Sequence, residues 1–144
     1  MTLIVADASV VVKWLVPQQE AEPDIEQAFR LLAEVRSGRA RLYQPAHWLA
    51  EAAAVVARLS PATARQKVSL LHAMGCRIVD DQAVYKTAVD LATDLNHHLF
   101  DTLYHAVALH VAEANLVTAD ERYFRKAYAY GRILRLADFD TPGY

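Results

Sequence analysis

Residues 115–124 read NLVTADERYF. In this stretch a short apolar run, Leu116–Val117, is followed within three residues by an acid, Asp120. The same order appears near the N-terminus, where the segment LIVADAS places Asp7 directly after an apolar run. Burial penalises a carboxylate that has no partner, so acids that repeatedly end apolar runs call for a common explanation.

Two further acids stand in apolar surroundings, and all four have an ordinary structural explanation. Asp101 opens the segment LFDTLYHAVA, and Glu51 lies within WLAEAAAVV. Asp7 stands where a helix N-cap is expected, and Asp101 and Asp120 fall in first helical turns, where the helix dipole favours acids. Thr118 and the residue three further on match a capping box, and Glu51 suits a solvated polar face.

Short apolar runs alternate with segments of helical periodicity along the whole chain. Strands are expected at 2–6, 41–44, 77–79, 116–118 and 133–136. Helices are expected at 9–16, 23–37, 45–59, 60–73, 82–95, 100–114 and 120–129, with Ile25, Phe29, Leu32 and Val35 inward in the second. Uniformly apolar strands that alternate with helices predict an α/β fold, in which helices cover both faces of a short parallel sheet of four to five strands.

The predicted sheet gives the four acids a shared location. Sites in such folds lie beyond the carboxyl ends of the strands, where Asp7 and Asp120 fall. Asp101 begins a helix that must pack on the sheet, and Glu51 borders the buried face of its own helix. Clustered carboxylates repel one another unless they are protonated or bridged by a cation, and oxygen ligands favour Mg²⁺ or Mn²⁺. The sequence therefore predicts a divalent metal site.

The overall composition sets broad limits on the protein. Its 144 residues suit one domain, spanning 1–144, and 54% of them are hydrophobic while 22% are charged. No apolar stretch is long enough for a transmembrane helix, and the N-terminus has no signal-like pattern, so we expect a cytoplasmic protein without membrane contact. The net charge of −2 counts against strong, nonspecific binding of nucleic acid.

Four segments carry a resemblance to a known family. VADAS, PAHWLAEAA, FDTLYHAVA and LVTADERYF, in this order and at these distances, resemble the PIN-domain family and, more narrowly, the VapC-like ribonuclease toxins of type II toxin–antitoxin systems. The resemblance covers about residues 1 to 140 and implies a Rossmann-like α/β/α sandwich. It also implies an acidic site that binds Mg²⁺ or Mn²⁺. The implied residues are Asp7, Glu51, Asp101 and Asp120 as catalytic acids, Asp7, Asp101 and Asp120 as metal ligands, and Ser9 and Thr118 as supporting residues.

The activity implied by this resemblance is metal-assisted hydrolysis of RNA phosphodiester bonds. Glu51 is expected to bind the metal through water or to orient the attacking water. Because water attacks, the products are expected to carry 5′-phosphate and 3′-hydroxyl ends. Contacts to the RNA backbone are expected from Lys13, Arg122 and Arg125, although these residues also fit the description of ordinary solvated surface charges.

Two protein partners are expected. Helices rich in Ala, Val and Leu favour a homodimer, because they offer more apolar surface than one small core absorbs. The resemblance implies a cognate VapB-like antitoxin, whose C-terminal segment lies over the acids and inserts a basic side chain in place of the metal.

Other functions are weaker alternatives. A haloacid-dehalogenase-like phosphohydrolase needs Asp-x-Asp after the first strand, but Ser9 stands at the third position. A non-catalytic interaction module on a PIN-like scaffold does not require all four acids. Six histidines raise the possibility of zinc, but the sequence has neither a His-Glu-x-x-His motif nor paired cysteines. His105, four residues after Asp101, is a candidate for a supporting position beside the acids.

Overall fold

A computed structural model gives the structure of residues 1–15 and 23–139. In this part of the chain, five strands form one parallel sheet with the order β3-β2-β1-β4-β5. The strands are β1 (Thr2–Ala6), β2 (Ala40–Gln44), β3 (Arg77–Ile78), β4 (Ala114–Thr118) and β5 (Ile133–Arg135).

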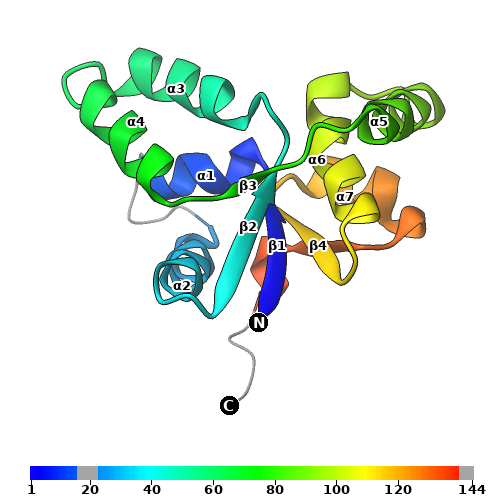
Figure 1. The fold of residues 1–144 in the computed structure, drawn as a ribbon, viewed down its shortest axis with the longest axis horizontal. Coiled ribbons are helices and arrows are strands. Elements are labelled where there is room, and N and C mark those ends of the chain that lie inside the picture. The colour runs from blue at the N-terminus through cyan, green and yellow to red at the C-terminus, as the bar shows by residue number, and fades with distance from the viewer. Residues whose placement is uncertain (16–22, 140–144) are drawn as a thin grey trace.

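Helices cover the sheet on both sides (Figure 1). One group, α1 to α4, lies to the left of the sheet in that view, and α5, α6 and α7 lie to the right. The helices are α1 (Ala8–Leu15), α2 (Ile25–Arg36), α3 (Trp48–Leu59), α4 (Ala64–Ala73), α5 (Gln82–Leu95), α6 (Leu99–His110) and α7 (Glu121–Ala127), with 3₁₀ turns at Tyr128–Tyr130 and Leu136–Asp138.

The core forms around the two central strands. Ile4, Val5 and Ala6 of β1 and Leu116 and Val117 of β4 are almost completely buried. Burial of consecutive residues follows from covering a parallel sheet on both faces, so these strands cannot alternate between polar and apolar side chains. The predicted α/β/α sandwich with a short parallel sheet is confirmed, and β1 and α5 have the predicted bounds.

The inward face of α2 differs in part from the prediction: Leu32 and Val35 pack against the core as predicted, but Phe29 does not. Phe29, expected in the core, is 41% exposed, whereas Ala28, Leu31 and Glu34 are buried. Glu34 is an unlikely core residue by type, but Nε of Arg39 donates to both of its carboxylate oxygens, at 3.2 and 3.1 Å. This paired charge allows the helix to turn its smaller apolar residues inward.

The boundary between α6 and β4 also differs. The predicted helix 100–114 ends at His110, and β4 begins at Ala114, two residues earlier than predicted. Residues 111–114 favour helix by composition, but the sheet requires Ala114 to pair with Leu3 of β1. The chain reverses over 111–113, where Val111 is extended and Glu113 takes a left-handed φ of 67°.

Other boundaries move by a few residues. The helices predicted from 45 and 60 begin at Trp48 and Ala64, because turns precede them, and α7 ends at Ala127 before a 3₁₀ turn. The predicted end of the first helix, at Val16 before Pro17, lies outside the described residues. Across residues 1–15 and 23–139, none of the helices combines the length and the apolar character that crossing a membrane requires.

Candidate active site

The register of the sheet brings two predicted site segments together. Parallel pairing of Ala6 with Val117 makes the next residues on the two strands, Asp7 and Thr118, neighbours at the carboxyl edge of the sheet. Asp120 follows two residues later, at the start of α7. Two segments more than 100 residues apart in sequence therefore meet at this edge (Figure 1).

Asp7 is partly buried at the end of β1 and carries a strongly perturbed carboxyl group. Burial raises the pKa of Asp7 from 3.8 to about 6, and the negative charge of Asp101 adds to the increase. Hydrogen bonds from Ser9, Thr118 and the Val10 amide act in the opposite direction. All three opposing groups are uncharged, so they offset only part of the cost of an ionised carboxylate there.

Ser9 and Thr118, the predicted supporting residues, join the ends of β1 and β4. The Ser9 hydroxyl donates to Oδ1 of Asp7 at 2.5 Å and accepts a hydrogen bond from the amide of Ala119 at 2.9 Å. Thr118 Oγ1 accepts from the amide of Asp120 at 3.0 Å and lies 3.5 Å from the Ser9 hydroxyl. These bonds fix the backbone that carries Asp7 and Asp120.

Asp120 is the N-cap of α7. Its Oδ1 accepts a hydrogen bond from the amide of Tyr123 at 3.0 Å, which satisfies one of the free amides of the first helical turn. The capping explanation considered from the sequence therefore holds for Asp120. Capping engages one carboxylate oxygen and does not exclude a ligand role for the other.

Asp101 stands in the first turn of α6, as predicted, and its side chain is 49% exposed. Its Oδ2 lies 2.9 Å from Nε2 of His97, in the loop between α5 and α6. The negative charge of Asp101 contributes to the raised pKa of Asp7.

Glu51 is brought to the same region by α3. The hydroxyl of Tyr104, on α6, donates to Oε1 of Glu51 at 2.7 Å. Burial raises the pKa of Tyr104 most, followed by the bond to Glu51 and the charges of Glu51, Asp7 and Asp101. Tyr104 is thus within the electrostatic field of three of the four acids.

A second tyrosine links the fourth acid to the group. Burial is the main cause of the raised pKa of Tyr123, and the charges of Asp7, Asp101 and Asp120 contribute to it. The charge of each of the four predicted acids therefore acts on Tyr104, on Tyr123 or on both. Neither tyrosine was predicted to lie near the acids. The periodicity of a helix indicates which side chains are buried, but it does not indicate which tyrosine hydroxyl will contact a carboxylate.

Gln44 is a further residue that sequence reasoning missed. Its buried side chain, at the end of β2, accepts from the amide of Ala6 at 3.0 Å and donates to the carbonyl of Ala6 at 2.9 Å. These bonds hold the last residue of β1, directly before Asp7. The available signal was a polar residue at a position where the strand's alternation of buried and exposed residues predicts a buried side chain.

His105, considered for a supporting position beside the acids, instead holds other elements together. The histidine is completely buried, its Nδ1 accepts from the Tyr123 hydroxyl at 2.9 Å, and its Nε2 donates to the carbonyl of Gly131 at 2.8 Å. Burial lowers the pKa of His105, in agreement with a neutral ring. Through Tyr123, it supports the helix that Asp120 caps.

The acids fit a hard divalent cation by the chemistry of their donors. They offer oxygen ligands only, which suits a hard cation, and burial together with the charge of Asp101 raises the pKa of the Asp7 carboxyl. Within residues 1–15 and 23–139, however, no three or more His, Cys, Asp or Glu side chains already stand in an arrangement that could hold a metal ion.

The three basic residues predicted to contact RNA differ in exposure. Arg122 and Arg125 are exposed on α7, near Asp120. Lys13 is only 9% exposed and its Nζ donates to the carbonyl of Pro23 at 3.0 Å. A backbone contact with RNA needs an accessible ammonium group, so this placement argues against the role predicted for Lys13.

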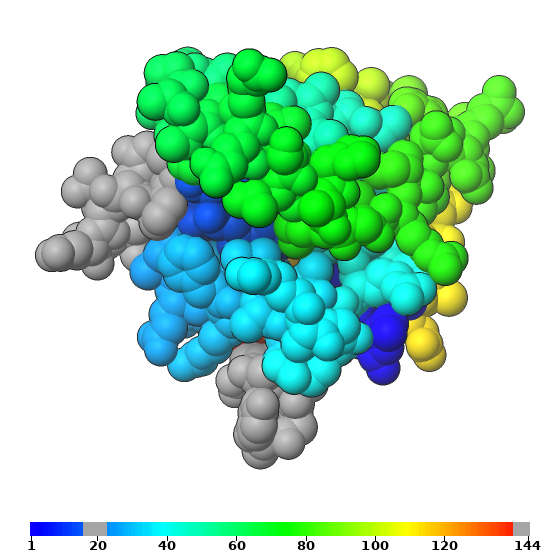
Figure 2. Space-filling view, turned by 60° about the vertical axis from the view of Figure 1, so that its left-hand side comes forward, coloured from blue at the N-terminus to red at the C-terminus, as the bar shows by residue number. Residues whose placement is uncertain are grey.

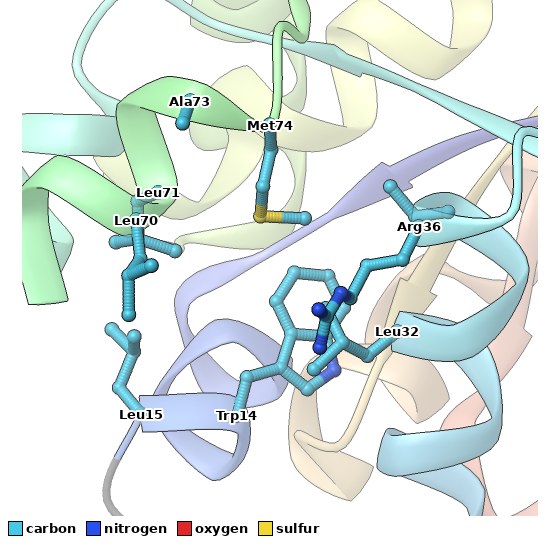
Figure 3. A pocket seen from close by; sticks show the side chains of 9 residues that line it. Trp14, Leu15, Leu32, Arg36, Leu70, Leu71, Ala73 and Met74 are labelled. Atoms are coloured by element: carbon cyan, nitrogen blue, oxygen red, sulfur yellow. The ribbon is translucent and has the colours of Figure 1, made fainter.

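One cavity lies away from the acids. It has a volume of about 520 Å³ and is lined by apolar side chains of α1, α2 and α4 together with Arg36. Figure 2 shows part of α1 in the gap between α4 and α2. In Figure 3, Leu15, Leu70 and Leu71 stand on one side of this cavity, across from Leu32 and Arg36.

Comparison with known families agrees with this arrangement. The family model described as "PIN domain" matches residues 4–130, a range that includes all four acids. No curated protein matches the chain. The PIN domain is a nuclease fold, and PIN domains are generally metal-dependent nucleases. Because the match spans most of its length, the chain belongs to the PIN-domain family.

Proposed function

We propose that this chain is a divalent-metal-dependent endoribonuclease of the VapC-like toxin type, formed by a single PIN domain over residues 1–144. The main supporting observation is the Asp7 carboxyl at the carboxyl edge of the sheet. Its pKa is raised to about 6 by burial and by the charge of Asp101, and only uncharged groups act against this. A site that disfavours two adjacent negative charges is a site that a divalent cation stabilises.

In this proposal the chain supplies four carboxylates with different tasks. Asp7, Asp101 and Asp120 hold Mg²⁺ or Mn²⁺, while Glu51 binds through water or orients the attacking water. The tasks are consistent with the contacts described above: hydroxyl and amide donors fix one oxygen of Asp7 and one of Asp120, and Tyr104 fixes Oε1 of Glu51.

The bound cation would lower the pKa of a coordinated water and offset charge on the scissile phosphate. The residues around it supply position, because Ser9 and Thr118 hold the two strand ends that carry the ligands. Arg122 and Arg125, both exposed on α7, are proposed to contact the RNA backbone. Arg122 lies in the first turn of α7, beside the N-cap Asp120, and Arg125 lies in its last turn, so a phosphate chain bound along this helix would reach the Asp120 end.

Cleavage assays on purified protein test this function. Wild-type protein with Mg²⁺ or Mn²⁺ is expected to cleave RNA to 5′-phosphate and 3′-hydroxyl products, and EDTA is expected to stop the reaction. D7N and D101N are expected to be folded and inactive. Wild-type rates in either variant, or products with cyclic phosphate ends, would show that the proposed site or reaction is wrong.

The proposed partners are a second copy of the chain and a VapB-like antitoxin. Large apolar side chains such as Val89 on α5 and Phe100 beside Asp101 are more than half exposed, which supports burial of such surface in a homodimer. Light scattering tests the dimer. The antitoxin is proposed to place a basic side chain among the acids, so a purified complex that cleaves RNA at the rate of the free chain would exclude this mode of inhibition.

A further inference from the structure

His97 connects a candidate metal ligand to a lysine on another helix. Its Nε2 lies 2.9 Å from Oδ2 of Asp101, and its Nδ1 lies 3.3 Å from Nζ of Lys126 on α7. The same lysine donates to the carbonyl of Asn96, the residue before His97, at 3.3 Å. The three side chains therefore form a continuous chain from Lys126 through His97 to Asp101.

The direction of each hydrogen bond in this chain is determined by Lys126. A protonated lysine donates and has no acceptor, so Nδ1 of His97 must accept. The ring hydrogen then resides on Nε2, which donates to Asp101. A neutral imidazole thus fixes one oxygen of the carboxylate and leaves the net charge of Asp101 in place.

The imidazole is held more firmly than an ordinary surface histidine. Its side chain is 12% exposed, against 49% for that of Asp101, and its ring centroid lies 4.8 Å from that of Tyr123 in an edge-on arrangement. Exposed pairs four residues apart usually contribute little to stability. Here both ring nitrogens are hydrogen-bonded and the ring also packs against Tyr123, which restricts the orientation of the donor.

We propose that His97 is a positioning residue for Asp101: with Lys126 it holds Oδ2 and thereby orients the carboxylate toward the cation. This inference rests on the proposed function, because it assigns Asp101 as a ligand. It also links the two sides of the site, since α7 carries Lys126 and Tyr123 as well as the Asp120 cap. Such partners of a ligating group commonly change metal affinity or activity by tenfold or more when removed.

The experiment compares variants that remove or retain the donor. Mn²⁺ is titrated calorimetrically into wild-type protein, H97L, H97Q and K126M, and RNA cleavage is measured on the same samples. H97L is expected to weaken Mn²⁺ binding about tenfold, whereas H97Q, which retains an N–H donor, is expected to stay within about threefold of wild type. K126M is expected to weaken binding about threefold, because Nδ1 loses its partner.

H72L serves as the matched control, because His72 is an exposed histidine of α4. It is expected to match wild type in binding and cleavage. If H97L does not fold, the comparison of K126M with H72L decides, and wild-type affinity in K126M overturns the inference.

Failure of the inference and failure of the proposed function give different results. Wild-type protein that binds no Mn²⁺ and cleaves no RNA would contradict both. Wild-type protein that binds and cleaves, together with an H97L variant of equal or tighter affinity, would overturn only the role of His97.

Discussion

The Tyr104 hydroxyl donates to Oε1 of Glu51 at 2.7 Å, across 53 residues of sequence. Tyr104 is 1% exposed, and burial together with the neighbouring acids raises its pKa, so the phenol retains its proton and always donates. Tyr104 lies three residues after Asp101 on α6, and the two residues therefore share one face of that helix. One helix thus presents a carboxylate to the site and fixes another that comes from α3.

Replacing Tyr104 by Phe tests whether the hydrogen bond from Tyr104 holds the Glu51 carboxylate in place. Y104F keeps the buried ring but releases Glu51, so it is expected to lower the rate of RNA cleavage about tenfold. Its free energy of unfolding is expected to fall by about 1 kcal/mol, the usual effect of losing one hydrogen bond. Y85F is the control, because Tyr85 is exposed on α5. A cleavage rate in Y104F equal to that of Y85F would contradict the assigned role.

Asp7 is expected to be a stability cost in the metal-free protein. A carboxyl whose pKa rises from 3.8 to about 6 destabilises the ionised folded state by up to about 3 kcal/mol. Because Asp7 is only partly buried, we expect D7N to stabilise the metal-free protein by about 2 kcal/mol at pH 7.5. Urea unfolding in EDTA measures this difference, and a destabilised D7N would contradict it.

The pH dependence of that difference has a definite sign. Between pH 3.8 and about 6, the folded state binds a proton on Asp7 that the unfolded state has lost. The contribution of Asp7 to stability therefore falls as pH rises through this window. His105 acts in the opposite direction, because its lowered pKa makes the folded state lose stability as pH falls below 6.5. Both proteins contain His105, so its effect cancels in the difference between their free energies of unfolding. That difference, the gain in stability of D7N over wild type, is expected to grow from pH 4 to 7. A gain that shrinks over this range would refute the assignment.

Ser9 is expected to contribute through two bonds at once. S9A removes the donor to Asp7 and leaves the amide of Ala119 without its acceptor, so we expect a loss of about 2 kcal/mol in the free energy of unfolding. S37A removes a single bond, to the carbonyl of Glu34 at the end of α2, and is expected to cost less than about 1 kcal/mol. Equal losses in the two variants would show that Ser9 does not join the strand ends in the way described.

The sequence predicted the parts of the site that depend on local pattern. Apolar runs followed by Asp7 and Asp120 identified the ends of β1 and β4. An unpaired carboxylate is costly to bury, so a charged residue marks the point where a fully buried strand ends. The parallel register then made these ends neighbours. Asp101 was predictable from a different local pattern, an acid in the first turn of an apolar helix.

The contacts that orient the acids were not predictable from local pattern. Gln44, His97 and Tyr104 act on residues 38, 4 and 53 positions away, and two of these distances exceed the length of any single element. On α2, Leu32 and Val35 pack against the core as predicted, but Phe29 does not, and the burial of Glu34 through its pair with Arg39 is not revealed by periodicity. The end of α6 was wrong because sheet pairing, rather than helix propensity, determines where β4 begins.

The most direct test of the central claim is an NMR titration of the full chain with Mn²⁺, which broadens the signals of amides close to the bound ion. We predict that the amides after β1 and β4, at the start of α6 and in the first turn of α3 broaden together at low Mn²⁺, while those lining the cavity between α1, α2 and α4 remain sharp. Broadening centred on any other part of the chain, or none that saturates, would contradict a shared metal site formed by Asp7, Glu51, Asp101 and Asp120.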